Sequence, residues 1–115
     1  MEKRPYVLWF SEIRKDDVPL VGGKNASLGE MYSRLSSKGV NVPNGFVITA
    51  EGYRYYLRYN GFDKQLQKIF SQLNPKKLKS VQAVGKKARD LILSGKLPED
   101  LKQEILKAYQ KLGKE

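Results

Sequence analysis

Residues 21–31 read VGGKNASLGEM, and this stretch places two glycines directly before a lysine and the start of a helical pattern. Glycine lets the backbone adopt conformations that are closed to other residues and approach a ligand closely. The N-terminus of a helix presents unpaired N–H groups and a partial positive charge to an anion. Gly22, Gly23 and Lys24 therefore form a candidate phosphate-binding corner.

The same three residues also suit a tight turn that is followed by a solvated lysine in the first turn of a helix. A Walker loop requires GxxxxGK[ST], and the dinucleotide-binding fingerprint requires GxGxxG. Neither spacing occurs around Gly22 and Gly23. Taken alone, the residues favour the plain turn.

Outward from this corner, the pattern predicts a helix-rich α+β fold with a few short strands and about five helices. Apolar and β-branched residues predict strands over residues 6–10 and 45–49, whereas residues 11–19 are expected to form a polar loop. Helices are expected around residues 24–38, 51–59, 66–73, 78–92 and 101–112, each from an apolar stripe of helical spacing. These stripes are expected to face the core.

In the first helix, the stripe predicted to reach the core consists of Leu28, Met31, Tyr32 and Leu35. The start of this helix has two candidate caps. Ser27 and Glu30 have the spacing of a capping box, and Asn25 is the alternative. Thr49 is expected to cap the helix over residues 51–59.

Length and composition limit the possible classes of protein. A chain of 115 residues is expected to form a single domain over residues 1–115. It has no cysteine and no histidine, which excludes disulfides and leaves zinc almost without ligands. No apolar run approaches the length of a membrane span, and the N-terminus lacks the features of a secretory signal. We therefore expect a cytoplasmic protein with no membrane partner and no metal site of its own.

The net charge of +10 is distributed unevenly. Residues 1–63 carry a net charge of +2 and residues 64–115 carry +8. A basic half of this kind can bind RNA or another polyanion, and Tyr55 and Tyr59 beside two arginines suit base stacking. It can equally be a solvated helical face or meet an acidic part of a larger protein. The second interpretation is favoured, with Tyr53 and Tyr56 packing inward, so nucleic acid is an unlikely partner.

The motif VGGKNASLGEM, followed by GVNVPNGFVIT at residues 39–49, resembles the opening of the phosphoenolpyruvate synthase and pyruvate phosphate dikinase family. The resemblance covers most of the chain, and its specific part lies between Trp9 and Asn60. It implies an N-terminal fragment of an ATP-grasp domain, specifically part of its first lobe. It also implies that Lys24 contacts the phosphates of ATP, with Gly22 and Gly23 leaving room for them.

In this family, ATP, pyruvate and water are converted to AMP, phosphoenolpyruvate and phosphate. A phosphohistidine domain and a pyruvate-binding barrel are therefore the implied partners, with Mg²⁺ as the metal. This chain has no histidine, and it lacks the arginine- and serine-containing strand and the acidic magnesium ligands of the family. We expect the N-terminal piece of a longer enzyme, with no catalytic residue of its own, inactive alone and binding ATP weakly at best.

Overall fold

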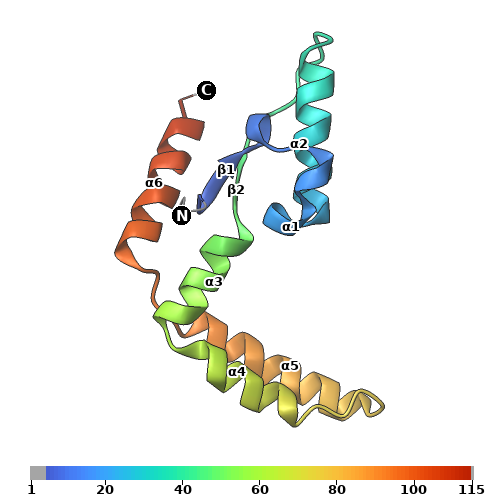
Figure 1. The fold of residues 1–115 in the computed structure, drawn as a ribbon, viewed down its shortest axis with the longest axis vertical. Helices are drawn as coiled ribbons and strands as arrows, with labels where there is room; N and C mark the ends of the chain where they lie inside the picture. Colours follow the sequence, from blue (N-terminus) through green and yellow to red (C-terminus); the bar gives the residue numbers. More distant parts are fainter. Residues whose placement is uncertain (1–4, 115) are drawn as a thin grey trace. The chain divides into compact units, whose positions relative to one another are not determined.

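The computed structural model describes residues 5–114, and within that range it is helix-rich with one small sheet (Figure 1). The elements in chain order are β1 (Val7–Trp9), the 3₁₀ turns η1 (Phe10–Glu12) and η2 (Lys15–Asp17), α1 (Val18–Val21), α2 (Gly23–Ser36), β2 (Phe46–Ile48), α3 (Ala50–Tyr59), α4 (Phe62–Ser71), α5 (Leu78–Leu93) and α6 (Glu99–Leu112). The predicted helix-rich α+β class is confirmed.

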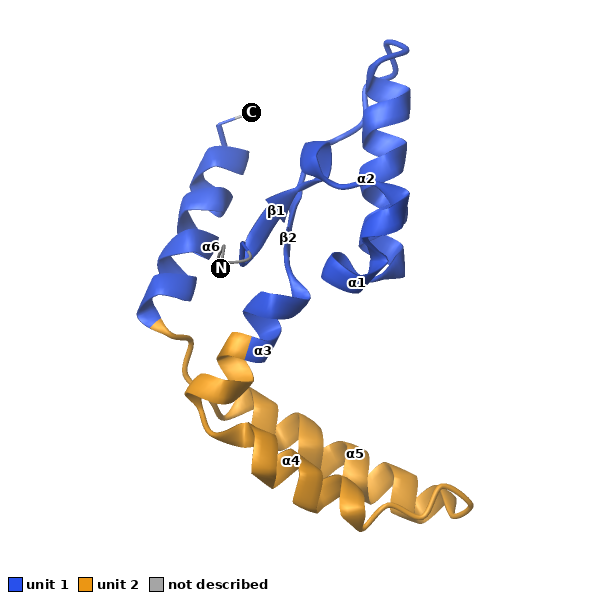
Figure 2. Cartoon of the chain, viewed as in Figure 1, with its two compact units in different colours: residues 1–54, 99–115 blue, residues 55–98 orange. Residues whose placement is uncertain are grey.

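The chain divides into two compact units (Figure 2). Unit 1 consists of residues 1–54 and 99–115, and unit 2 consists of residues 55–98. Unit 1 therefore contains the sheet, the glycine corner and α6, whereas α4 and α5 belong to unit 2. The expectation of a single domain over residues 1–115 stays a prediction. Within residues 5–114, no helix is both long and apolar enough to cross a bilayer.

Strands β1 and β2 pair antiparallel, and both lie where the sequence predicts strands. The opposed residues are Val7 and Ile48, Leu8 and Val47, and Trp9 and Phe46. Two further backbone bonds of 2.9 Å extend the pairing, from Phe10 N–H to the Gly45 carbonyl and from Thr49 N–H to the Tyr6 carbonyl. The sheet thus joins the chain before α1 to the chain before α3.

Residues 11–19 are not the polar loop that was predicted. They form most of η1, all of η2 and the first half of α1, and they contain Ile13, which is fully buried. Carboxylates stabilise both 3₁₀ turns: Glu12 accepts the N–H of Trp9 at 3.0 Å, and Asp17 accepts the N–H of Arg14 at 2.9 Å. The prediction failed because the two aliphatic residues of this segment, Ile13 and Val18, are five positions apart and show neither helical nor strand periodicity.

The core of unit 1 forms where these turns meet α2. Its buried members are Ile13, Val21, Ala26 and Val47, and Leu8, Phe10 and Leu20 pack against them. On α2, the buried residues are Ala26 and Gly29. This is the opposite face of the helix from the one that the sequence predicts.

The predicted core stripe of α2 is therefore wrong. Met31 is exposed, and Leu28, Tyr32 and Leu35 are only half-buried. Small residues on the other face let η1 and η2 approach the helix axis closely. Because alanine and glycine project little from the helix, the turns can pack closely against its backbone on this face. For this reason α2 packs through alanine and glycine.

Thr49 caps α3, as predicted. Its Oγ1 accepts the N–H of Gly52 at 3.2 Å and its hydroxyl donates to the Pro5 carbonyl at 2.8 Å. Thr49 is 1% exposed, and its bond from the Gly52 N–H is buried, whereas its bond to the Pro5 carbonyl is partly buried. One buried threonine thus ties the start of α3 to the chain before β1.

Unit 2 is built on the packing of α4 against α5 (Figure 2). Phe62, Val84 and Ala88 are buried in it. Tyr56 joins this packing, because its ring lies 6.2 Å from that of Phe62 and its hydroxyl donates to the Ile92 carbonyl. The inward packing predicted for Tyr56 is confirmed, whereas that predicted for Tyr53 is wrong, since Tyr53 is exposed.

Candidate functional site

The glycine corner is the junction between α1 and α2, and Gly22 alone forms the bend. Its φ is 84° and its ψ is 162°, a backbone region that is essentially restricted to glycine. Its N–H donates to the Val18 carbonyl at 2.8 Å, and its carbonyl accepts the N–H of Ala26 at 3.0 Å. Gly22 therefore ends one helix and begins the next without an intervening loop.

Gly23 and Lys24 are the first two residues of α2. A Cβ built on Gly23 meets no atom of residues 5–114 within 4 Å, so no described neighbour requires a glycine at this position. Lys24 is exposed. The three ion pairs among residues 5–114 are Arg34–Glu30, Arg54–Glu51 and Lys86–Asp90, and none of them uses the Lys24 amine. The structure thus keeps the three predicted site residues together on the surface.

The N-terminus of α2 has no side-chain cap, and its first turn has no acidic residue. Both predicted caps are wrong. Ser27 and Glu30 lie inside the helix, and the Asn25 amide donates instead to the Val21 carbonyl at 2.9 Å. The first N–H groups of a helix have no partner within the helix itself. Together with the positive end of the helix dipole and the exposed Lys24 amine, these N–H groups make a corner suited to an anion.

Sequence reasoning missed two residues that hold this corner in place. Asn25 fixes the last carbonyl of α1, and Gly29 allows Ile13 to lie against α2. A signal for Gly29 was present, because small residues recur at helical spacing at positions 22, 26, 29 and 33. Nothing in the local sequence marks Ile13 as its neighbour.

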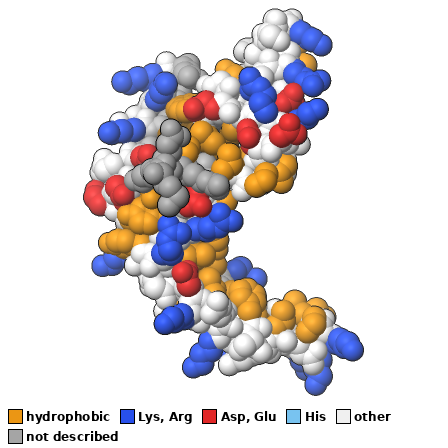
Figure 3. Space-filling model, viewed as in Figure 1, with side chains coloured by type: hydrophobic (Ala, Val, Ile, Leu, Met, Phe, Trp, Pro, Cys, Tyr) orange, Lys and Arg blue, Asp and Glu red, His pale blue; other side chains and the backbone are white. Residues whose placement is uncertain are grey.

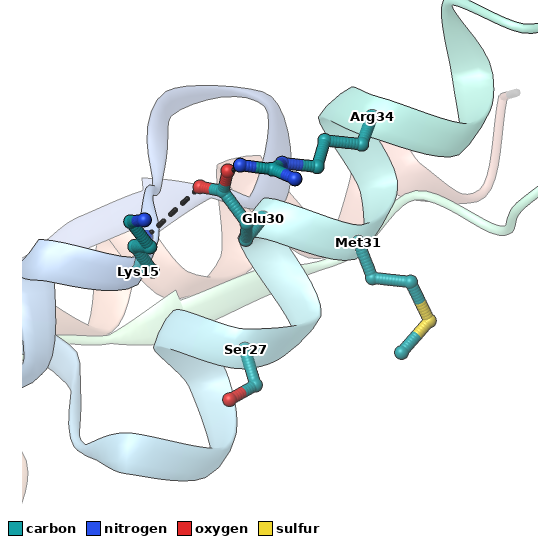
Figure 4. Close-up of a pocket in the computed structure, with 5 residues that line it drawn as sticks. All are labelled: Lys15, Ser27, Glu30, Met31 and Arg34. Carbon is teal, nitrogen blue, oxygen red and sulfur yellow. Dashed lines mark hydrogen bonds and ion pairs between the residues drawn. The ribbon is translucent and has the colours of Figure 1, made fainter.

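A pocket of about 390 Å³ lies farther along α2, where the helix meets η2 (Figure 4). Its lining residues are Lys15, Ser27, Glu30, Met31 and Arg34. Glu30 accepts the Lys15 backbone N–H at 3.0 Å and the Arg34 Nε–H at 2.7 Å. Lys24 does not line this pocket, so the pocket is separate from the glycine corner.

The N–H of Lys15 and the guanidinium of Arg34 hold the pKa of Glu30 below its usual value. We therefore expect Glu30→Gln to lower the free energy of unfolding at neutral pH. Because the pKa of Glu30 is lower in the folded state than in the unfolded state, the ionised carboxylate stabilises the fold at pH values above its unfolded-state pKa. This stabilisation is lost as the pH falls through the folded-state pKa. The difference between wild type and Glu30→Gln should shrink below about pH 4.

Urea denaturation at neutral pH and at about pH 3 measures this effect. Glu104→Gln is the matched control, since Glu104 is exposed and forms none of the described ion pairs. A destabilisation by Glu30→Gln that stays constant across this pH range would contradict the assigned role of the carboxylate.

Among residues 5–114 there is no group of three or more acidic side chains that could hold a metal ion. The glycine corner offers backbone N–H groups and the Lys24 amine, which suit a phosphate.

Comparison with known proteins points to one family. A family profile described as "Pyruvate phosphate dikinase, AMP/ATP-binding domain" matches residues 18–115. The phosphoenolpyruvate synthase of Aquifex aeolicus is 44% identical over 96% of this chain. The phosphoenolpyruvate synthases of Synechocystis and Neisseria meningitidis are each 46% identical, over 90% and 93% of the chain. The matched region is 13% of the first two proteins and 14% of the third, so the chain spans a small part of their length.

Proposed function

The chain belongs to the pyruvate phosphate dikinase AMP/ATP-binding family, and from this membership we propose that its glycine corner binds the phosphates of ATP. We further propose that it serves as the nucleotide-binding N-terminal part of a phosphoenolpyruvate synthase. That enzyme would convert ATP, pyruvate and water to AMP, phosphoenolpyruvate and phosphate. The chain alone is expected to be inactive.

One observation carries the proposal: α2 begins without a side-chain cap, beside an exposed Lys24 that forms none of the ion pairs within residues 5–114. A surface helix that only had to be stable would gain from an acidic or hydroxyl side chain at this position. An anionic ligand can supply the missing acceptor. The open space around Gly23 would let that ligand approach the backbone closely.

Each residue of the corner then has a defined task in binding. Gly22 sets the direction of α2, Gly23 leaves the backbone N–H groups accessible, and Lys24 neutralises phosphate charge. Such fixed donors position a phosphoryl group for in-line attack and stabilise charge that develops during its transfer. The corner contains no nucleophile and no general base.

The later steps require groups that this chain does not contain. Because the chain has no histidine, a phosphohistidine relay must use another part of the protein. We propose that the chain forms part of the first lobe of an ATP-grasp domain. Mg²⁺ ligands, a phosphohistidine domain and a pyruvate-binding barrel would then lie outside it. The proposed setting is a cytoplasmic enzyme of gluconeogenesis.

Two alanine variants distinguish the contribution of the corner to folding stability from its contribution to ATP binding. Gly22→Ala should lower the free energy of unfolding by about 1–3 kcal/mol, because its backbone conformation strains any residue with a Cβ. Gly23→Ala should change stability by less than about 0.5 kcal/mol, because its Cβ has open space. The same Cβ should weaken ATP binding about tenfold, since it occupies the space of the ligand.

The measurement is a titration of the ¹⁵N-labelled chain with ATP and Mg²⁺, followed by backbone amide shifts, together with urea denaturation of each variant. The largest shifts should fall within residues 21–31. Shifts that centre elsewhere, or an unchanged ATP affinity in Gly23→Ala, would refute the assignment of the site.

A further inference from the structure

The positive charge of the chain is concentrated in unit 2. Residues 55–98 contain ten lysines and arginines against two aspartates and no glutamate, so they carry +8 of the total charge of +10. All ten cationic side chains are exposed. Among the described residues of this unit there is one ion pair, Lys86–Asp90 at 2.8 Å. Two aspartates can neutralise only a small part of this charge.

The end of unit 2 that contains the α4–α5 turn is also apolar, and we call residues 68–81 the hairpin end (Figure 1). Every residue from Phe70 to Lys79 is exposed. The large apolar side chains of the hairpin end are Phe70, Leu73, Leu78 and Val81, which are 51%, 37%, 71% and 43% exposed. Lysines 68, 76, 77 and 79 lie among them in the sequence. Figure 3 shows hydrophobic and cationic side chains next to each other on this hairpin.

Hydrogen bonds hold the turn of the hairpin end in one conformation. The Asn74 N–H donates to Ser80 Oγ at 2.8 Å, and Asn74 Oδ1 accepts the N–H of Lys76 at 3.1 Å. The N–H of Lys77 donates to the Asn74 carbonyl at 3.0 Å. A surface ordered before binding loses less conformational entropy when a partner docks.

We propose that the hairpin end docks an acidic amphipathic helix of a protein partner. The exposed apolar side chains would contact the apolar stripe of that helix, and the surrounding lysines would pair with its carboxylates. An apolar centre with a charged and polar rim is the usual composition of a protein interface. The inference is independent of ATP binding, because the glycine corner belongs to unit 1.

Charge and chemistry favour this partner over a second copy of the chain and over nucleic acid. A second copy of the chain would bring two hairpin ends of the same charge together, which is unfavourable. Nucleic acid would attract the lysines but leave three aliphatic side chains without an apolar partner, because its backbone is charged. A lipid surface also accepts apolar and cationic side chains, and the vesicles in the test below distinguish it from a protein partner.

The test uses the full chain with a synthetic helix-forming peptide of glutamate and leucine, and amide shifts as the readout. The reference ligands are the same peptide with serine in place of leucine, poly(U) RNA, and vesicles of equimolar phosphatidylcholine and phosphatidylserine. The leucine-containing peptide should bind about tenfold more tightly than the serine peptide and should shift residues 68–81. Its affinity should fall as salt is added.

Two variants and one matched control locate the contact. Leu78→Ser should weaken peptide binding about tenfold with little effect on folding, because the side chain is mostly exposed. Lys79→Glu should weaken it by a similar factor, and an acid in the first turn of α5 favours the helix. Lys87→Glu makes the same charge change away from the hairpin end and should change the affinity less than about twofold.

Tighter binding to poly(U) or to the vesicles than to the leucine-containing peptide would overturn the proposal in favour of those partners. The proposal would also be overturned if the two peptides bound equally, or if Lys79→Glu and Lys87→Glu had equal effects. Concentration-dependent dimerisation in sedimentation would overturn it as well. A negative result in the peptide experiment has no bearing on the result of the ATP titration, so the two proposals can fail separately.

Discussion

Replacement of Gly29 by alanine is expected to lower the free energy of unfolding by about 3 kcal/mol, the largest stability effect that we predict for a single methyl group. A Cβ at this position would lie 2.5 Å from Cβ of Ile13, 2.6 Å from its Cγ2 and 2.7 Å from its carbonyl oxygen. All three distances are far shorter than van der Waals contact. Ile13 is fully buried, so it has no free space into which it can move.

The expected cost exceeds that of an ordinary overpacked core position because one of the three atoms belongs to the backbone. Truncation of the neighbour should therefore not restore stability. In the double variant Ile13→Ala with Gly29→Ala, the Cβ and the carbonyl oxygen of residue 13 both remain, so the clash persists. The double variant should be less stable than either single variant.

Gly85→Ala is the matched control, since Gly85 is also inside a helix, α5. Its added Cβ would meet only the Arg89 Nη1 atom, at 3.1 Å, and this flexible side chain can move away. Alanine is the better helix former, so Gly85→Ala should raise stability by about 0.5–1 kcal/mol. Urea denaturation of the two variants decides the matter. Similar stabilities for Gly29→Ala and wild type would show that Ile13 does not pack on α2 as described.

Replacement of Lys24 by alanine is expected to reduce the affinity for ATP by a factor of about 10 to 100. This range corresponds to the loss of about 1.5–3 kcal/mol from a hydrogen bond between charged groups. The free energy of unfolding should stay within about 0.5 kcal/mol of wild type, because the side chain is exposed and forms no described ion pair. A binding defect without a folding defect distinguishes a ligand contact from a structural residue.

Lys38→Ala is the control for the loss of one positive charge, since Lys38 is exposed in the turn just after α2. It should change ATP affinity less than about twofold, because salt screens charges that lie more than about 8 Å from the ligand. Both variants are titrated with ATP and Mg²⁺ under identical salt conditions. Equal losses for the two lysines would show that ATP is attracted by general charge and not held at the glycine corner.

The features that could be predicted from the sequence are those that depend on neighbouring residues. The helical pattern after Gly23, the two strand segments and the cap at Thr49 are confirmed. The helix and the cap depend on contacts within a few positions, and apolar and β-branched residues mark the strands locally, whereas the pairing of Val7 with Ile48 is a contact between distant segments. The order of glycine, glycine and lysine likewise places the candidate site at a helix start. Its role in binding ATP stays a prediction.

The wrong predictions share a different cause. Ile13 is buried within residues 11–19 by contacts with distant segments, so no apolar periodicity distinguishes this segment from a loop. Ser27 and Glu30 have the spacing of a cap, but the helix begins four residues earlier at Gly23 and the carboxylate of Glu30 bonds to Lys15 and Arg34. A motif of two residues does not specify which N–H group donates to the carboxylate.

The sequence by itself determined where α2 begins, that its first turn carries a lysine and no acid, and that most of the positive charge follows residue 63. Only the tertiary structure decided which face of α2 is buried. Two stripes satisfy the helical period, one of large apolar residues and one of small residues, and periodicity cannot rank them. Ile13 determines which stripe is buried, because it lies against Gly29 and leaves no room there for a larger side chain.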